Sequence, residues 1–334
     1  MSVLEAAGLS KHYQARNGLF GSRGMVRAVD DISFAIEPGK TLGVVGESGC
    51  GKTTTAKLVL GLEQPTGGAI RFEGQNLATL DEAGRRRYRR SVQAVFQDPF
   101  ASLNPRMRVG AIISEPVTTH EKLNAGELER RVARLLDLVG LPARAAALFP
   151  HEFSGGQRQR IAIARALALS PKLVVLDEPV SALDVSIRAQ ILNLLCDLQD
   201  QLGLSYLFIA HDLAAIAHMS HDIVVMYLGK IVESGEARAL VRAPKHPYTA
   251  ALFAAALPSS PDEQHEEVVL TGEVPSPLRP PPGCHFHPRC PSAMARCGEE
   301  PPTLAPVGDH LVACHLYDGG TRCRATGAQP RATR

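Results

Sequence analysis

A glycine-rich segment behind an apolar run limits the folds open to this chain more than any other feature does. Residues 46–53 read Gly-Glu-Ser-Gly-Cys-Gly-Lys-Thr, which fits the pattern G-x-x-x-x-G-K-[ST]. The preceding run Thr41–Val45 is predicted to be a strand, and Thr54–Leu60 a helix that ends at Gly61. In that context the glycines let backbone N–H groups face phosphate oxygens, and the helix start adds a positive dipole end. The segment therefore predicts a nucleotide phosphate site.

Residues 46–53 form the segment that we call the P-loop. Lys52 can reach the β- and γ-phosphates of a nucleotide, and the Thr53 hydroxyl can coordinate Mg²⁺. The alternative is a chance glycine-rich turn, which the flanking strand and helix disfavour. The nucleotide-binding residues predicted here are Gly46, Glu47, Ser48, Gly49, Cys50, Gly51, Lys52, Thr53 and Thr54.

A second apolar run, Leu173–Leu176, ends in two carboxylates. Asp177 suits a water-mediated contact with Mg²⁺, and Glu178 suits the role of general base or of a group that positions water. Adjacent side chains on a strand point to opposite faces, so we expect a sharp turn at Pro179 to bring both to one nucleotide. A solvated acidic strand end is the alternative.

A third element, the signature segment Ser154-Gly155-Gly156-Gln157, opens a helix that is predicted to run to Ala168. The Ser154 hydroxyl and the free N–H groups of the helix start can hold a γ-phosphate, whereas an ordinary N-cap is the alternative. One nucleotide does not need two such anion sites. The pair therefore suggests a nucleotide that two subunits share.

The order of these three elements resembles that of the ATP-binding-cassette (ABC) ATPases. The resemblance implies that Gln97 is the Q-loop glutamine, that Asp184 ends the D-loop, and that His211 is the switch histidine. It makes Tyr13 the aromatic residue that stacks on adenine, with Phe20 as the alternative. In this family Glu178, His211 and Gln97 would be catalytic, Mg²⁺ would lie near Thr53, Gln97 and Asp177, and Ser154, Gly155, Gly156, Gln157 and Asp184 would contact the nucleotide.

The resemblance also implies a fold and a division into domains. We expect an α/β P-loop NTPase fold with a RecA-like core, an antiparallel β subdomain and a helical subdomain, followed by a small loop-rich C-terminal domain. The expected ranges are 1–257 for the ATPase domain with its helical subdomain at about 98–170, 258–318 for the C-terminal domain, and 319–334 for a flexible tail.

Four further segments, Gln97–Arg106, His246–Leu252, Gly272–Pro277 and Cys284–Cys290, resemble the ATPases of dipeptide and oligopeptide importers. This implies an ATP-hydrolysing subunit that energises peptide import by ATP-driven dimerisation, at the cytoplasmic face of the inner membrane. Its implied partners are a second ATPase subunit, often a different chain, two permease subunits and an extracytoplasmic peptide-binding protein. Importers of nickel, glutathione or opines are the alternative within transport. A non-transport ABC ATPase is disfavoured, because the chain has one cassette and no heptad run.

Cysteines are concentrated near the C-terminus. Four of them are spaced C-x5-C-x6-C-x16-C, at Cys284, Cys290, Cys297 and Cys314. Four thiolates suit either tetrahedral Zn²⁺ or a cubane iron–sulfur cluster, and typical zinc sites pair cysteines two to four residues apart. The family resemblance implies a [4Fe–4S] cluster, with Zn²⁺ as the alternative. Because no P-loop or signature residue lies in this segment, we expect its loss to leave the nucleotide site intact.

Composition argues against nucleic acid as a partner. The net charge is only +2, Trp is absent and aromatic residues make up 5% of the chain. The arginine-rich run at 85–90 is predicted to lie on an exposed helix, where a solvated face is favoured over nucleic acid or lipid. No apolar run reaches the ~18–20 residues that span a bilayer, and no secretory signal begins the chain. We therefore expect a cytosolic chain that meets the membrane only through partners.

Overall fold

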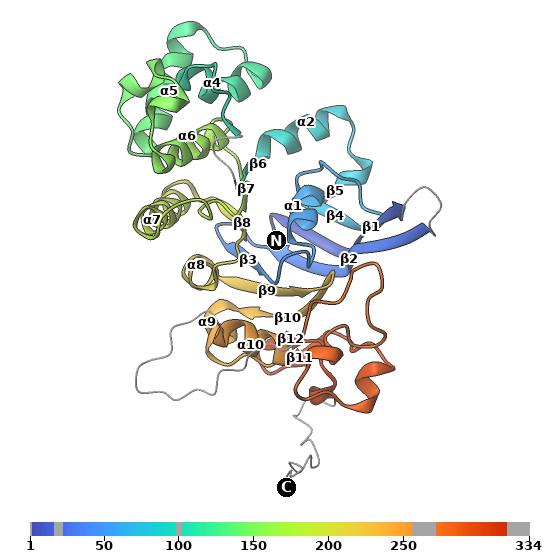
Figure 1. Ribbon diagram of the computed structural model, residues 1–334. Coiled ribbons are helices and arrows are strands. Elements are labelled where there is room, and N and C mark those ends of the chain that lie inside the picture. The colour runs from blue at the N-terminus through green and yellow to red at the C-terminus, as the bar shows by residue number, and fades with distance from the viewer. Residues whose placement is uncertain (1, 17–22, 98–101, 256–271, 319–334) are drawn as a thin grey trace.

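The structure, a computed structural model, describes residues 2–16, 23–97, 102–255 and 272–318 (Figure 1). Its main sheet has eight strands in the order β11-β12-β10-β9-β3-β8-β7-β6. The five strands from one edge of this sheet inward are parallel: β6 (Val92–Val95), β7 (Leu173–Asp177), β8 (Ser205–Ile209), β3 (Thr41–Val45) and β9 (Asp222–Tyr227). The other three are antiparallel: β10 (Lys230–Glu236), β12 (His310–Val312) and β11 (Ala305–Val307).

A second sheet of four antiparallel strands has the order β2-β1-β4-β5. Its strands are β1 (Leu4–Arg16), β2 (Arg23–Ile36), β4 (Gly67–Phe72) and β5 (Gln75–Asn76). The helix α1 (Lys52–Val59) contacts β2 of this sheet and also β7 and β8 of the main sheet. It therefore lies between the two sheets, with the P-loop at its N-terminal end.

Buried side chains cover both faces of the main sheet. Along β7, Val174 and Leu176 belong to one apolar cluster, whereas Leu173 and Val175 belong to the other. This two-residue alternation of fully buried aliphatic residues is typical of a parallel sheet that is covered on both sides. The first cluster also contains the helices α7 (Val185–Leu202), α8 (Leu213–Met219), α9 (Ala237–Arg242) and α10 (Pro247–Ala254).

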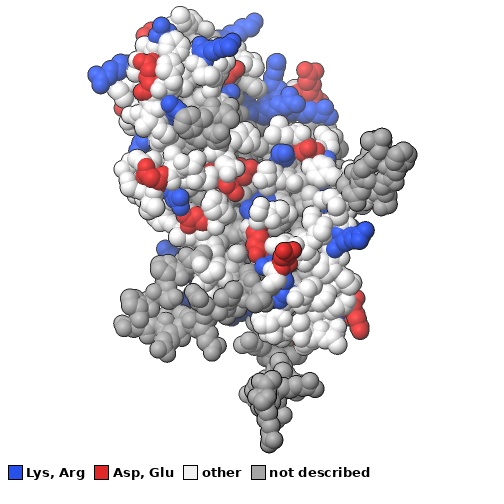
Figure 2. Space-filling model, in the orientation of Figure 1, with Lys and Arg blue, Asp and Glu red and all other residues white. Residues whose placement is uncertain are grey.

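Three helices gather at one end of the molecule, beyond β6 and β7 (Figure 1). They are α4 (Val109–His120), α5 (Ala125–Leu138) and α6 (Gly155–Leu167), and all fall within 98–170, the range predicted for a helical subdomain. A further helix, α2 (Glu82–Ser91), carries the arginine-rich run, and Figure 2 shows basic side chains gathered over it. Its arginines are exposed, as expected of a solvated face.

Several predicted elements agree with the structure. The strand Thr41–Val45 has the predicted bounds, and the helix predicted after the signature segment is α6, which Ser154 caps through its side chain. The antiparallel pair β1–β2 reaches from the Leu4–Ile36 pair to the Arg16–Arg23 pair, and 17–22 lie outside the described residues. The helix α1 begins at Lys52, two residues before the predicted start.

The C-terminal segment is joined to the main sheet instead of lying apart as loops alone. The strand β12 pairs with β10, and β11 pairs with β12. The fully buried carboxylate of Glu233 fixes this junction, because it accepts the backbone N–H groups of Lys245 and His246 at 2.8 Å and lies 2.7 Å from Nδ1 of His310. The boundary at 257/258 stays a prediction, since 256–271 and the tail 319–334 lie outside the described residues.

Candidate nucleotide site

Most of the predicted P-loop residues and the three predicted catalytic residues line one cavity of about 520 Å³. It opens at the carboxyl ends of parallel strands, where α/β sheets bind ligands. Gln97 follows β6, Glu178 follows β7, and His211 follows β8. The predicted residues that line the cavity are Ser48, Gly49, Gly51, Lys52, Thr53, Thr54, Gln97, Glu178 and His211.

Two glycines of the P-loop are required by close backbone packing. Both have positive φ, 150° at Gly46 and 112° at Gly51. A Cβ at Gly46 would lie 2.2 Å from the Met226 carbonyl oxygen, and one at Gly51 would lie 2.2 Å from that of Ala28. The strands β9 and β2 thus press directly on the loop, and only glycine fits at these two positions.

Lys52 is the buried cation of the site, with 7% of its surface exposed. Its ammonium group donates to the carbonyl oxygens of Gly46 at 2.6 Å and Glu47 at 3.1 Å. The P-loop therefore curls around its own lysine, at the N-terminal end of α1. This is the geometry in which backbone N–H groups and an ammonium group can face the same phosphate.

Of the two carboxylates, Asp177 ends β7 and Glu178 begins a turn. The predicted turn at Pro179 is present, because the Ser181 N–H donates to the Glu178 carbonyl oxygen at 3.3 Å. Glu178 itself adopts a left-handed backbone with φ of 51°. A non-glycine residue there is strained, and its backbone N–H is anchored to the Ile209 carbonyl oxygen at 2.8 Å. The turn places Glu178 in the lining of the cavity, with Oε2 3.3 Å from Nδ1 of His211.

Asp177 lies behind this lining and is 8% exposed. Burial and the neighbouring Glu178 carboxylate raise the pKa of Asp177, and the ammonium group of Lys52 opposes the rise. A buried carboxylate of this kind favours its charged form when a cation lies beside it. Asp177 is thus chemically suited to the Mg²⁺ contact that the sequence predicts.

The signature residues lie elsewhere in the chain. Ser154 and Gln157 form a capping box at the start of α6, in which Ser154 Oγ accepts the Gln157 N–H and Gln157 Oε1 accepts the Ser154 N–H. Asp184 caps α7 by accepting the Ile187 N–H at 2.9 Å. None of the predicted residues Ser154, Gly155, Gly156, Gln157 and Asp184 is among the described residues that line the cavity.

Tyr13 is likewise not among the described residues that line the cavity. The ammonium group of Lys11 lies 5.0 Å from the centre of its ring. Val26, which pairs with Tyr13 across β1 and β2, does line the cavity, as do Ala28 and Pro277. No motif predicts these three residues, and the adenine-stacking role of Tyr13 stays a prediction.

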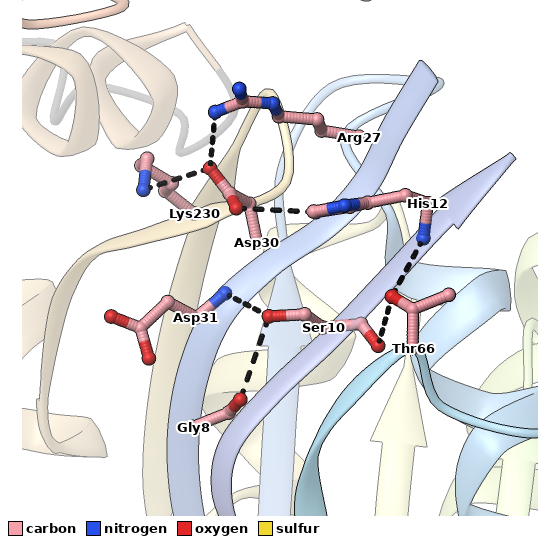
Figure 3. A network of polar contacts seen from close by, with 8 residues as sticks. All are labelled: Gly8, Ser10, His12, Arg27, Asp30, Asp31, Thr66 and Lys230. Atoms are coloured by element: carbon pink, nitrogen blue, oxygen red, sulfur yellow. Dashed lines mark hydrogen bonds and ion pairs between the residues drawn. The ribbon is translucent and has the colours of Figure 1, made fainter. Parts of the chain in front are cut away.

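A polar network holds β2 beside the P-loop (Figure 3). The carboxylate of Asp30 contacts Lys230 at 3.0 Å, His12 at 3.3 Å and Arg27 at 3.7 Å. Burial opposes the charge on this carboxylate, but Lys230, His12 and Arg27 together hold the pKa of Asp30 below its usual value. The network ties β1 and β2 to the start of β10, and so fixes the strand whose Ala28 carbonyl packs on Gly51.

The cysteine segment contacts the P-loop directly, whereas the expectation that loss of the cysteine site leaves the nucleotide site intact stays a prediction. Arg289, next to Cys290, binds both carboxylate oxygens of the P-loop residue Glu47, at 2.7 and 3.0 Å. Pro277 of the C-terminal segment also lines the cavity. Arg289 is 242 residues from Glu47 in the chain, and no local pattern predicts a contact over that separation.

The structure brings the four cysteines near one another. Burial raises the pKa of Cys290 to about 11 and that of Cys314 to about 12, and the neighbouring Cys284 and Cys297 add to both rises. The Cys284 N–H donates to the Cys297 carbonyl oxygen at 2.8 Å. Within the described part of the chain, however, no group of three or more His, Cys, Asp or Glu is placed to hold a metal ion. Cys323 lies outside that part.

Fold and site together define a P-loop ATPase. Residues 29–181 match the ABC transporter family, and residues 232–297 match the oligopeptide/dipeptide transporter C-terminal region. A solved dimeric ATP-binding cassette, MJ0796, bound to ADP and Pi, is 26% identical with a TM-score of 0.62 and covers 70% of this chain and 99% of its own. The structure of cbiO1 from Clostridium perfringens has the same identity and score, and covers 72% and 91%.

Curated relatives cover almost the whole chain. The dipeptide transport ATP-binding protein DppF of Haemophilus influenzae is 49% identical over 317 residues, which are 95% of this chain and 97% of that protein. The oligopeptide transport ATP-binding protein AppF of Bacillus subtilis is 49% identical over 322 residues, 95% and 98% of the two chains. The chain therefore belongs to the ATP-binding proteins of dipeptide and oligopeptide ABC transporters, and the predicted fold is confirmed. No helix in its described part is long and apolar enough to cross a membrane.

Proposed function

We propose that this chain is the ATP-hydrolysing subunit that energises import of dipeptides or oligopeptides through a membrane transporter. The observation that carries the proposal is the convergence of Lys52, Glu178 and His211 on one cavity, in a chain whose relatives are named as peptide transport ATP-binding proteins. Every catalytic element is present, which supports an active ATPase over a degenerate partner subunit.

Each group of the site has a task in hydrolysis. Lys52 and the P-loop N–H groups hold the phosphates, and Mg²⁺, bound with the nucleotide near Thr53, Gln97 and Asp177, would neutralise charge that develops on them. Glu178 orients the attacking water and accepts its proton. His211, whose Nδ1 lies 3.3 Å from Oε2 of Glu178, would hold that carboxylate in place.

The site is completed by a second subunit. Ser154, Gly155, Gly156, Gln157 and Asp184 lie away from the cavity of their own chain, which supports the proposal that they act on the nucleotide of a partner. ATP would close such a dimer because both chains grip it, and hydrolysis would release it. The solved cassette MJ0796, which is dimeric with ADP and Pi, supports this arrangement.

The remaining partners follow from the family. We propose two permease subunits, an extracytoplasmic peptide-binding protein and a paralogous second ATPase, with this chain at the cytoplasmic face of the inner membrane. Residues near Gln97–Arg106 would pass the closing motion to a permease. We propose that residues 1–257 form the ATPase domain, 258–318 the C-terminal domain and 319–334 a tail.

The test is transport. The proteins that co-purify with this chain from membranes are first identified and then reconstituted with it into vesicles. After ATP is added, the uptake of labelled dipeptide, oligopeptide, nickel, glutathione and opine is compared. ATP-dependent uptake of peptide supports the proposal. Uptake of nickel, glutathione or an opine alone selects the alternative substrate, and ATP hydrolysis with no associated membrane proteins overturns the transport role.

We further propose that Cys284, Cys290, Cys297 and Cys314 hold a [4Fe–4S] cluster. Cys284 and Cys297 lie near enough to raise the pKa of Cys290 and of Cys314, and none of the intervals between the four cysteines matches the two to four residues between paired cysteines of typical zinc sites. Protein prepared without oxygen should be brown and contain about four iron atoms per chain. Stoichiometric zinc without iron would show a zinc site in place of the cluster. If the protein contained neither metal, the four cysteines would be free thiols.

A further inference from the structure

Two side chains from the last third of the protein hold one residue of the P-loop. The Arg289 guanidinium forms a two-pronged ion pair with the Glu47 carboxylate. The Tyr248 hydroxyl accepts the backbone N–H of the same Glu47 at 2.8 Å. Glu47 is therefore fixed at both its side chain and its main chain, and neither partner belongs to the P-loop or to its flanking elements.

A buried aromatic cluster holds the side chains of Arg289 and Tyr248 in place. The side chain of Arg289 is only 5% exposed, and one of its nitrogens also donates to the Tyr227 hydroxyl at 3.4 Å. The rings of Tyr227, Tyr248 and Phe286 pack together, with centres 4.7 to 5.4 Å apart, and all three are fully buried. The backbone N–H of Arg289 donates to the Phe286 carbonyl oxygen at 3.0 Å, so the arginine is anchored to that cluster.

Glu47 in turn controls the shape of the loop. Its carbonyl oxygen accepts from the Lys52 ammonium group and from the Cys50 N–H, at 3.1 and 3.3 Å. Gly46, Gly49 and Gly51 all have positive φ, so the loop has little conformational preference of its own. A loop of this kind binds phosphate tightly only if other contacts order it beforehand, because otherwise binding must supply the ordering free energy.

We propose that Arg289 is a positioning residue that acts through Glu47 to keep the P-loop in its phosphate-binding shape. By this contact the cysteine segment sets the affinity of the nucleotide site, although none of its cysteines lines that cavity. The inference rests on the proposed function to the extent that the cavity binds ATP. It goes beyond that function by assigning a task to the C-terminal segment.

The experiment compares variants of the full chain for Mg-ATP binding, ATP hydrolysis and thermal unfolding. Arg289→Met should weaken ATP binding about tenfold and raise KM by the same factor while kcat changes little, because the lost contact supports ground state and transition state alike. Arg289→Lys should weaken ATP binding less than Arg289→Met does, since an ammonium group keeps the charge but cannot form the two-pronged ion pair. Arg296→Met is the matched control, because Arg296 pairs with Glu300 and Asp318 in the same segment but does so at the surface.

A double-mutant cycle separates positioning from folding. Glu47→Gln changes a residue outside the C-terminal segment, and should weaken ATP binding without lowering the unfolding temperature of that segment. If Arg289 acts through Glu47, the double variant loses little more than either single variant. Three results would each overturn the inference. They are additive losses of ATP affinity in the double variant, a full return of the double variant to wild-type affinity, and a loss of affinity in Arg289→Met no larger than that in Arg296→Met. Wild-type protein that binds no ATP would instead overturn the proposed function.

Discussion

Gly156 should tolerate no side chain, for a reason separate from phosphate binding. A Cβ built there lies 2.5 Å from Cγ2 of Ile187 on the neighbouring helix α7, whereas real contacts of this kind exceed 3 Å. Relief of such a clash in a packed site costs typically about 1–3 kcal/mol. The better helix propensity of Ala returns at most about 1 kcal/mol. Gly156→Ala should therefore lower the free energy of unfolding by about 1–2 kcal/mol in the balance of these two effects.

The adjacent glycine is the control. A Cβ at Gly155 meets only Leu183, at an ordinary 3.5 Å, so Gly155→Ala should leave stability unchanged or raise it slightly. Urea unfolding of both variants measures the difference. The double variant Gly156→Ala with Ile187→Ala should lose less than the sum of the single changes, because the clashing methyl group is gone. Equal stability of the two glycine variants would refute the packing argument.

Two substitutions test the chemistry of the cavity. Lys52→Ala should abolish ATP binding or hydrolysis, because the phosphates lose their fixed counter-charge, and equal ATPase rates of variant and wild type in the assembled transporter would contradict the P-loop assignment. Glu178→Gln should retain ATP and trap a closed dimer while turnover falls about 10²–10⁴-fold, since the water loses its base. Rapid hydrolysis by this variant would move the base to another residue.

Local signals explain why so much of the site could be predicted. The P-loop, the acidic end of β7 and the cap of α6 are contiguous segments, and each carries its chemistry within eight residues. Parallel strands then bring Gln97, Glu178 and His211 to one edge of the sheet without further information.

The features that the sequence did not predict depend on distant contacts. The left-handed turn at Glu178 is set by its hydrogen bond to Ile209, and no glycine marks it. The ion pair of Arg289 with Glu47 and the bond of Tyr248 to the same residue span 242 and 201 positions. Motifs could single out Tyr248 and Arg289 as resembling the family, but only the folded chain shows that both meet the P-loop.

The junction between the ATPase core and the C-terminal segment should also make stability depend on pH, through His246. Burial lowers the pKa of His246 to about 3, from an ordinary value of 6.5. Its Nδ1 accepts the Tyr248 N–H at 3.0 Å and so caps α10, while Nε2 has no partner among the described residues. Protonation would remove the cap acceptor and leave a buried charge.

The sign follows from the lower pKa in the folded state. Between pH 6.5 and about 3 the unfolded chain binds a proton at His246 that the folded chain does not. The contribution of the neutral His246 ring to the free energy of unfolding is therefore fully present above pH 6.5. It decreases as the pH falls, by about 2 kcal/mol at pH 5. His246→Asn keeps a side-chain acceptor for the cap but cannot titrate, so urea unfolding at pH 7.5 and pH 5 should show a smaller decrease for this variant than for wild type. Carboxylates are common to both proteins and cancel in the comparison, so equal decreases would show that His246 is not the group that titrates.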